Sequence, residues 1–313
     1  MISRTTLTAA ATLCTAVVAL AGCSGHTGGG ESASGASKAA AAPALTATAD
    51  PELAKLLPAK IRDKGVINVG SDIPYPPFEY LDEQGTATGF DPELIGLMAD
   101  KFGIKVDYQN QPFDTAIPSL QAGKHDVIMS GMNDTVERQK TLDFVDYTHS
   151  GFQILVPAGN PKGIKDAMDM CGLTVAVQKA TIQADVVREL PCAAQGRQPA
   201  TVNEFPKDND ALTALRAGKA QAYVSDGPVS EYVASTTDDG KTYEVVRDPA
   251  KPEGFNPVYS GIAMLKGQPE LLNALKMALQ SLIDDGTYQK LLERNGLSAY
   301  GVKAAGVNQG GAG

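Results

Sequence analysis

Two segments of this 313-residue chain follow the same pattern in the same register. Residues 116–130 read AIPSLQAGKHDVIMS, and residues 211–225 read ALTALRAGKAQAYVS. Each segment predicts a helix that stops at Ala-Gly-Lys, followed by an apolar strand with a serine at its tip. Ala-Gly-Lys is a common helix stop, so chance alone could produce a local match of this kind.

The order of the preceding elements favours a real repeat. An apolar strand with a polar exit precedes each copy, at residues 66–72 and at residues 173–181. We therefore predict an α/β fold with two lobes of the same βαβ architecture. Open α/β sheets bind ligands beyond the carboxyl ends of their strands, so two such lobes predict a cleft. The strand tips that would line it are Ser71, Asp72, Ser130 to Asn133, Lys179 to Gln183, Ser225 and Asp226.

The stretch from Val127 to Arg138 predicts a site for a carboxylate. An apolar strand runs into small polar residues and then into a helix start that carries Arg138. Backbone NH groups, a helix N-terminus and a guanidinium fork all favour an anion. The alternative is a capped surface helix with a solvated arginine. The matching tip in the second copy carries Asp226, so an anion site and a cation site would face each other, as a zwitterion requires.

A loop stiffened by three prolines follows the first strand, at residues 71–78. Such a loop can present side chains rigidly, and its candidates for ligand contact are Asp72, Tyr75 and Phe78. The alternatives are a turn-forming role for Asp72 and local packing for the two aromatic rings.

The N-terminus predicts an exported, anchored protein. Residues 1–22 read as a signal peptide, because Arg4 precedes a short apolar run without carboxylates. Leu-Ala-Gly-Cys at residues 20–23 resembles the bacterial lipobox, which implies that Cys23 is lipidated, with palmitate among its acyl chains. The alternative is a secreted protein with a stray cysteine. Residues 23–50 are rich in Gly, Ser, Ala and Thr and predict a flexible tether, and residues 301–313 predict a disordered tail.

Charge and cysteine content narrow the function further. Removing residues 1–22 removes one arginine and no carboxylate, so the net charge of -9 becomes -10, which argues against a nucleic-acid partner. Cys171 and Cys192 predict a disulfide, with two buried free thiols as the alternative. The three histidines are not at metal-ligand spacing, so we predict no metal and no cofactor.

Several motifs together resemble one family, the polar amino-acid-binding subunits of ABC importers, which have the periplasmic-binding-protein-like type II fold. The resemblance covers nearly the whole mature domain. It implies that residues 51–155 and 258–300 form lobe 1 and residues 156–257 form lobe 2, with hinge crossings near Gln153 to Pro157 and Asn256 to Tyr259. The motifs, in the family's order, are VGSDIPYPPFEY at residues 69–80, GFDPEL at 89–94, FDTAIPSLQAGK at 113–124, DVIMSGM at 126–132, Glu137-Arg138, and DGTYQKLL at 285–292.

The resemblance also implies roles for ten residues. The α-carboxylate of the ligand is bound by Arg138, the Asn133 region and backbone NH groups near Thr181 and Ile182. Asp226 takes the α-ammonium, Asp72 faces the ligand side chain, Tyr75 and Phe113 flank it, and Ser130 and Gly131 supply main-chain or hydroxyl contacts. Two departures weaken a transfer of fine specificity: Ala180-Thr181-Ile182 lacks a hydroxyl that relatives often carry, and Asn133 stands where some have serine.

We therefore expect a monomeric, non-enzymatic receptor on the outer face of the cytoplasmic membrane, which hands a free amino acid to an ABC permease. Asp72 opposite the ligand side chain favours glutamine, arginine, histidine, lysine or ornithine over glutamate. The alternatives are a cyclohexadienyl-dehydratase-like enzyme on the same fold and a sensor partner of a membrane kinase.

Overall fold

The structure, a computed structural model, describes residues 45–311. The expected signal peptide, the lipidated Cys23 and the first part of the tether lie outside the described residues. The end of the tether, residues 45–50, packs against lobe 1 instead of standing free. The backbone NH of Ala47 donates to Asp100 Oδ2 at 3.4 Å, and that of Asp50 donates to the Lys101 carbonyl at 2.8 Å. The ordered domain therefore begins before residue 51, the boundary expected from the sequence.

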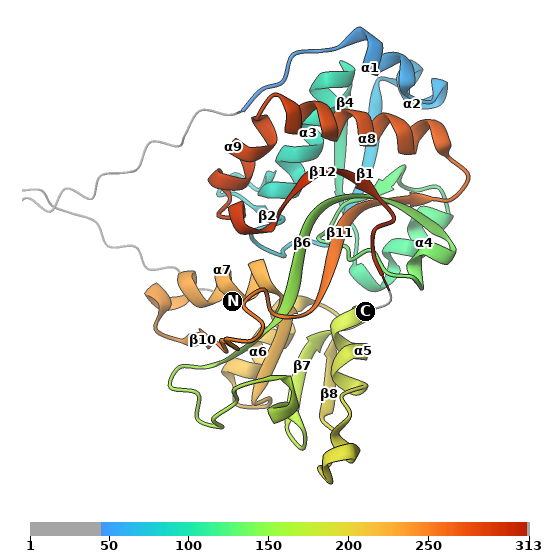
Figure 1. The fold of residues 1–313 in the computed structure, drawn as a ribbon. Coiled ribbons are helices and arrows are strands. Elements are labelled where there is room, and N and C mark those ends of the chain that lie inside the picture. The colour runs from blue at the N-terminus through green and yellow to red at the C-terminus, as the bar shows by residue number, and fades with distance from the viewer. Residues whose placement is uncertain (1–44, 312–313) are drawn as a thin grey trace, which may run out of the picture. The chain divides into compact units, whose positions relative to one another are not determined.

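Lobe 1 consists of a parallel sheet with helices packed against it (Figure 1). Its β1 lies between β4 and β5 and is parallel to both. The long α8 buries Leu271, Leu275, Ala278, Leu279 and Leu282, the inner face that its apolar spacing predicts. The elements of this lobe are α1 (Pro51–Leu56), α2 (Ala59–Lys64), β1 (Val66–Ser71), β2 (Tyr80–Leu81), β3 (Ala87–Thr88), α3 (Phe90–Phe102), β4 (Lys105–Asn110), η1 (Phe113–Thr115), α4 (Ala116–Gln121), β5 (Val127–Ile128), η2 (Arg138–Lys140), α8 (Pro269–Asp284), α9 (Thr287–Arg294) and η6 (Ser298–Tyr300).

Lobe 2 repeats the same local order. Its β7 lies between β8 and β9 and is parallel to both, as β1 is to its two neighbours in lobe 1. In each lobe the helix of the matched segment, α4 or α6, leads into the strand beside the central one, so the predicted repeat is confirmed. The elements of this lobe are η3 (Ala167–Met170), β7 (Thr174–Gln178), α5 (Ile182–Arg188), η4 (Cys192–Gln195), β8 (Thr201–Phe205), α6 (Asp208–Arg216), β9 (Ala222–Asp226), α7 (Gly227–Thr236), η5 (Thr237–Gly240) and β10 (Tyr243–Val245).

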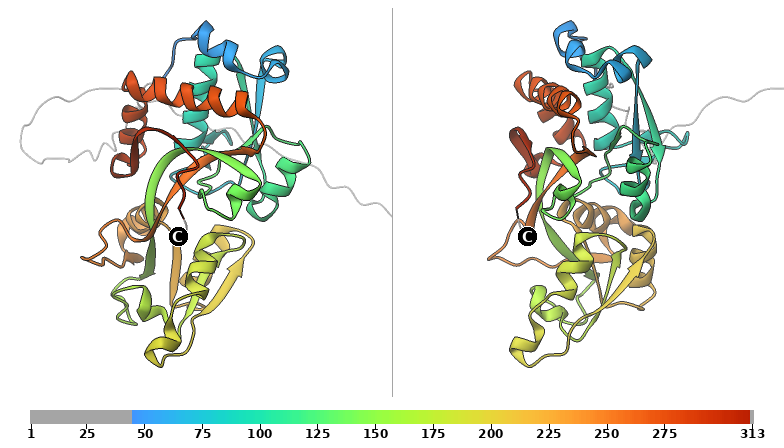
Figure 2. Two further views of the ribbon diagram at one scale, coloured as in Figure 1. Left: turned by 45° about the vertical axis from the view of Figure 1, so that its right-hand side comes forward. Right: turned by 90° about the vertical axis from the view of Figure 1, so that its right-hand side faces the viewer.

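Two long antiparallel strands, β6 (Leu142–Pro157) and β11 (Phe255–Leu265), connect the lobes and run side by side in all views (Figures 1 and 2). Within residues 45–311 they join the sheets of the two lobes into a single sheet of ten strands. The first crossing lies slightly earlier than expected, because residues from Phe152 onward already pair with β9. At the crossing, Gly254 has a φ of +91°, and a Cβ there would lie 2.3 Å from the Phe152 carbonyl, so the close approach requires glycine.

The expectation of a disordered tail after Tyr300 is wrong for most of that segment. Residues 301–310, which we call the C-terminal strap, form β12 (Gly301–Val307) and continue along β6 (Figure 1). Beyond β12, the backbone NH of Gln309 donates to Asp146 at 2.9 Å and that of Gly310 donates to Asp134 at 2.7 Å. Pairing with a distant strand therefore orders a segment whose composition predicts disorder.

The predicted disulfide between Cys171 and Cys192 is confirmed, with the two Cα atoms 5.6 Å apart. It closes a loop in lobe 2 with a sequence separation of 21 residues. A loop of this size corresponds to roughly 3 kcal/mol of stabilisation in the chain-entropy model. Within residues 45–311 no helix is both long and apolar enough to span a membrane.

Candidate ligand-binding site

A small cavity lies where the carboxyl ends of the strands from both lobes meet. Its walls contain eight of the ten residues that the sequence assigns to ligand binding, since Arg138 and Ile182 are not among the lining residues. Ser71 and Gln178 end β1 and β7, and Asp226 ends β9, which is the arrangement that open α/β sheets predict. The lining residues are Asp72, Tyr75, Phe113, Ser130, Gly131 and Asn133 from lobe 1, and Gln178, Thr181, Gln183 and Asp226 from lobe 2.

Asp226 is the anionic group of this cavity in lobe 2, and it is bonded across the cleft. Its carboxylate accepts from the Tyr75 hydroxyl at 2.6 Å and from Asn133 Nδ2 at 2.9 Å. Burial raises the pKa of Asp226, while the hydrogen bonds from Tyr75 and Asn133 and the nearby Arg138 charge lower that pKa. A carboxylate with several donors around it is suited to exchange one of them for an ammonium group.

Arg138 is a cationic group that lies beside the cavity without lining it. Its guanidinium donates to the Asn133 carbonyl at 2.7 Å within lobe 1 and to the Ala180 carbonyl at 3.1 Å in lobe 2, and it lies 5.4 Å from the centroid of the Phe113 ring. Burial lowers the pKa of Arg138 to about 10, so the side chain remains a cation at neutral pH. The expected α-helix start is instead a 3-10 helix that begins at Arg138 itself.

Asp72 provides a second carboxylate. It accepts from Gln178 Nε2 across the cleft at 2.6 Å, and its backbone NH donates to Ser130 Oγ at 2.9 Å. Burial raises the pKa of Asp72, and the bond from Gln178 lowers it. Nearby, Lys179 of lobe 2 pairs with Asp114 of lobe 1 at 3.0 Å. Polar pairs from both lobes thus close the cleft at several points.

Ser130 and Gly131 line the cavity, but their donor groups are bonded within lobe 1. The Ser130 hydroxyl donates to Glu79 at 2.9 Å, and the Gly131 NH donates to Asp91 at 2.9 Å. A Cβ on Gly131 would lie 3.1 Å from the Tyr75 ring, and the φ of Gly131 is +53°. These two residues therefore form a fixed part of the cavity wall. The absence of a side chain on Gly131 leaves room for the Tyr75 ring.

Two glutamines of lobe 2 line the cavity: sequence reasoning missed Gln178, and it placed Gln183 at a cleft-lining tip without giving it a role. Gln178 is the last residue of β7, one position before the tip that the strand pattern indicates. Gln183 is 3% exposed, and its side chain bonds to Asp226. Within residues 45–311 its Oε1 atom has no hydrogen-bond partner. Ile182 is not among the lining residues and packs against the core of lobe 2 instead.

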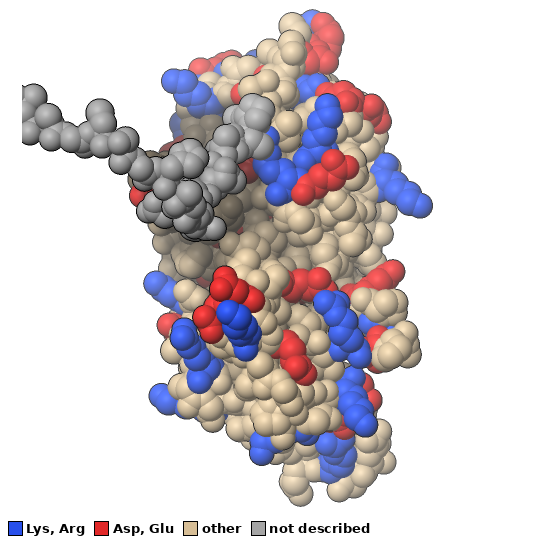
Figure 3. All heavy atoms as spheres, turned by 90° about the vertical axis from the view of Figure 1, so that its left-hand side faces the viewer, with Lys and Arg blue, Asp and Glu red and all other residues tan. Residues whose placement is uncertain are grey.

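The described part of the chain was compared with the features expected of a metal site and of a nucleic-acid site. In residues 45–311 no group of three or more His, Cys, Asp or Glu side chains is placed to hold a metal ion. On the face drawn in Figure 3, basic and acidic side chains are interspersed. An extended surface of one sign, the usual footprint of a nucleic-acid site, is not seen on that face.

Residues 67–297 match the model of the bacterial extracellular solute-binding proteins, family 3. The chain belongs to this family. It is 35% identical to the arginine-binding protein ArgT of Corynebacterium glutamicum over 265 residues, which are 83% of this chain and 83% of that protein. This relative is thus named as an amino-acid-binding protein and not as an enzyme.

Two solved structures are also similar to this chain. One is the ancestral amino acid-binding protein AncCDT-1, a precursor of cyclohexadienyl dehydratase, with a TM-score of 0.67, 36% identity, and coverage of 77% of this chain and 99% of that chain. The other is an ancestral arginine-binding protein bound to glutamine, with a TM-score of 0.66, 35% identity, and coverage of 74% and 98%. Both confirm the two-lobe type II fold. The relative connected with the dehydratase is itself named as a binding protein.

Proposed function

We propose that this protein is a receptor that captures a cationic or amide amino acid between its lobes and delivers it to an ABC importer. The observation that carries the proposal is that Asp226 of lobe 2 lines the cavity and that Arg138 of lobe 1, which does not line it, lies close enough for the two charges to interact. Each group influences the pKa of the other. A guanidinium for the α-carboxylate and a carboxylate for the α-ammonium are what a free amino acid requires.

The preferred side chain follows from Asp72. Its partly buried carboxylate accepts from the Gln178 amide, and an amide or a cation on the ligand could replace that donor. A ligand carboxylate would instead face a like charge. Arginine, lysine, ornithine, histidine and glutamine are therefore favoured over glutamate. The names of the similar proteins, one arginine-binding and one with bound glutamine, support the same class.

Binding requires the lobes to separate and close again. The cavity encloses about 10 Å³, roughly the space of one water molecule, so it must open to admit an amino acid. The two crossings, β6 and β11, are where such a hinge motion would occur. Closure would then present one shape to a permease, with Cys23 as the proposed lipid anchor.

A thermal-shift screen of the refolded, ligand-free protein tests this function. A ligand that binds only the folded state at a hundred times its Kd adds about 2.7 kcal/mol to the free energy of unfolding, so Tm rises. We expect stabilisation by one or more of arginine, lysine, ornithine, histidine and glutamine. The Arg138→Ala variant should lose stabilisation by every amino acid.

The matched control is Arg216→Ala, which removes an exposed arginine of α6 in lobe 2 and should leave the shift intact. Stabilisation by no amino acid, or by prephenate alone, would overturn the receptor function. Retained affinity in Arg138→Ala would overturn the proposed carboxylate contact.

A further inference from the structure

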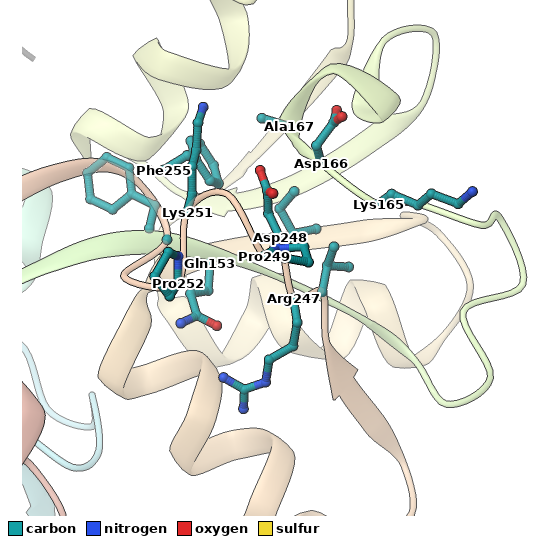
Figure 4. A pocket seen from close by; sticks show the side chains of 14 residues that line it. Gln153, Lys165, Asp166, Ala167, Arg247, Asp248, Pro249, Lys251, Pro252 and Phe255 are labelled. Carbon is teal, nitrogen blue, oxygen red and sulfur yellow. The ribbon is translucent and has the colours of Figure 1, made fainter.

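The two lobes differ in how they hold charged groups away from the ligand contacts. A cavity of about 210 Å³ in lobe 2 lies beside the crossing strands, and its charged residues Lys165, Asp166 and Lys251 are exposed to solvent (Figure 4). In lobe 1, Glu79 and Asp91 are each 0% exposed. A charge in water needs no partner in the protein, whereas a buried carboxylate does. The partners of Glu79 and Asp91 therefore decide in which form these two groups exist.

Glu79 and Asp91, which we call the acid pair, interact directly through their side chains. The Ser130 hydroxyl donates to Glu79 Oε1 at 2.9 Å. The Gly131 NH and the Tyr147 hydroxyl donate to Asp91 Oδ2 at 2.9 and 2.8 Å. The other two oxygens, Glu79 Oε2 and Asp91 Oδ1, have no hydrogen-bond partner among residues 45–311. Two ionised carboxylates cannot bond to each other, because both only accept.

The surroundings of the acid pair contain no compensating positive charge. Asp72 after β1, Tyr108 of β4 and Tyr147 of β6 act on the pair electrostatically, and no cation is among the groups that shift either pKa. Burial, followed by the Asp91 charge, raises the pKa of Glu79 well above its ordinary value, and burial raises the pKa of Asp91 to about 6. Asp91 accepts from more donors, so it is the member that stays ionised.

We propose that Glu79 is a neutral carboxylic acid at neutral pH, that its Oε2–H group donates to the Asp91 carboxylate, and that this acid pair positions the lobe 1 wall of the ligand cavity. One proton then gives a partner to both remaining oxygens. The single buried negative charge on Asp91 is stabilised by three donors. The positioning role rests on the proposed function, whereas the protonation of Glu79 does not.

Three residues of the cavity wall are bonded to Glu79 directly or through one neighbour. Ser130 donates to Glu79, and its Oγ atom accepts from the Asp72 NH at 2.9 Å. The Tyr75 NH donates to the Glu79 carbonyl at 2.7 Å, and the Glu79 NH donates to the Tyr75 carbonyl at 3.3 Å. Tyr75 in turn donates to Asp226 across the cleft. A second buried charge on the acid pair would therefore disturb the wall that faces the ligand.

Infrared spectroscopy of the ligand-free protein at pH 8 tests the proton. A protonated carboxylic acid has a carbonyl stretch that is distinct from the bands of a carboxylate and of an amide. We expect this band in the unaltered protein, its loss in Glu79→Gln, and a shift when the glutamate side-chain carboxyls are labelled with carbon-13. Glu83→Gln, the matched control, changes an exposed glutamate of lobe 1 and should keep the band. A spectrum from which Glu79→Gln removes no such band, or a band that shifts only with labelled aspartate, would overturn the proposal.

Calorimetric titration of arginine tests the positioning role. The amide of Glu79→Gln keeps an acceptor for Ser130 and a donor for Asp91, so arginine affinity should stay within about threefold. Glu79→Ala removes both groups and should lower the affinity at least about tenfold. Unchanged affinity in Glu79→Ala, or a loss in Glu79→Gln as large as in Glu79→Ala, would overturn this role.

The two measurements also separate the acid pair from the proposed function. Because an amide does not replace an ionised carboxylate without loss, Glu79→Gln decides the question even where Glu79→Ala does not fold. Glu83→Ala should bind arginine as the unaltered protein does. A protein that binds no amino acid would contradict the proposed function and with it the positioning role, whereas the infrared band would still establish or refute the proton.

Discussion

Asp72 is the residue on which ligand preference depends in this account. It directly follows the first strand of lobe 1, and its carboxylate accepts a hydrogen bond from the amide of Gln178 from lobe 2 at 2.6 Å. The two α-groups of any amino acid would be bound elsewhere, by Arg138 and Asp226. Changes at Asp72 should therefore alter which amino acid binds and leave the capacity to bind amino acids intact.

The Asp72→Asn variant tests this separation. We expect its affinity for arginine or lysine to fall about 10- to 100-fold, because a hydrogen bond to a charged group contributes about 1.5–3 kcal/mol. Glutamine should lose far less, since an amide can pair with an amide. Calorimetric titration of each amino acid measures the change, with Asp114→Asn as a control at the Lys179 ion pair outside the cavity. Equal losses for arginine and glutamine would contradict the role of Asp72.

The sequence was sufficient to predict some of the residues near the cavity but not others. Asp226 is the last residue of an apolar strand and Arg138 lies in the segment after another, so their charges mark the ends of strands that the fold brings together. Gln178 is the last residue of its strand and lay just outside the predicted tip, whereas Gln183, in the helix after it, lay inside the tip but had no charge that would give it a role. Several polar side chains stand at each strand end. The one that faces the cleft is determined by packing against the other lobe, whose residues are distant in the sequence.

At the level of elements, the C-terminal strap connects β6 to the loop that carries Asn133 and Arg138. It pairs with β6 and ends on Asp134, the neighbour of Asn133, where Gln139 also donates to the Gly310 carbonyl at 3.1 Å. A Cβ on Gly310 would lie 2.0 Å from the Asp134 carbonyl, so the strap approaches this loop as closely as glycine allows. The strap thus holds the loop that carries Asn133 and Arg138.

Truncation of the chain after Tyr300 should lower both stability and affinity. The loss of the β12 pairing and of the bonds to Asp134 and Asp146 should cost several kcal/mol of unfolding free energy, since each hydrogen bond contributes about 1 kcal/mol. Arginine affinity should fall because the Arg138 loop loses its support. Urea unfolding and calorimetry measure the two effects, with truncation after Gly310 as the control. An unchanged affinity in the protein that ends at Tyr300 would show that the strap has no part in binding.

The strap could not be predicted from the sequence for a physical reason. Its Gly- and Ala-rich residues have neither helical nor alternating apolar spacing, and its order comes from a strand more than 150 positions earlier, as the pairing of Gly301 with Thr148 illustrates. The family match also ends at residue 297. The α8 helix, in contrast, was predictable because its apolar spacing alone specifies the buried face.

At the scale of the whole molecule, buried carboxyl groups set the response to pH. Burial is the main cause that raises the pKa of Asp91 to about 6 and those of Asp146 and Asp208 to about 7. The unfolded value is about 3.9, so the folded protein binds more protons between pH 4 and pH 7. The free energy of unfolding therefore falls as pH rises through this window and levels off above it.

We accordingly expect a higher Tm at pH 5 than at pH 8. Asp146→Asn keeps an oxygen that can accept from the Gln309 backbone and removes one titrating group, so the fall between the two pH values should be smaller. Thermal unfolding of both proteins at the two pH values provides the comparison. A Tm that rises from pH 5 to pH 8, or an equal fall in the variant, would contradict this assignment.

We propose that the two lobes hold a zwitterion, with Arg138 on its carboxylate and Asp226 on its ammonium. The most direct measurement compares the amino acid that stabilises the protein most with the amine that remains when its α-carboxylate is removed, for example arginine with agmatine. Calorimetric titration should give one-to-one binding of the amino acid and at least about hundredfold weaker binding of the amine, because the buried guanidinium then lacks its counter-ion. Equal affinities for the two would contradict the account.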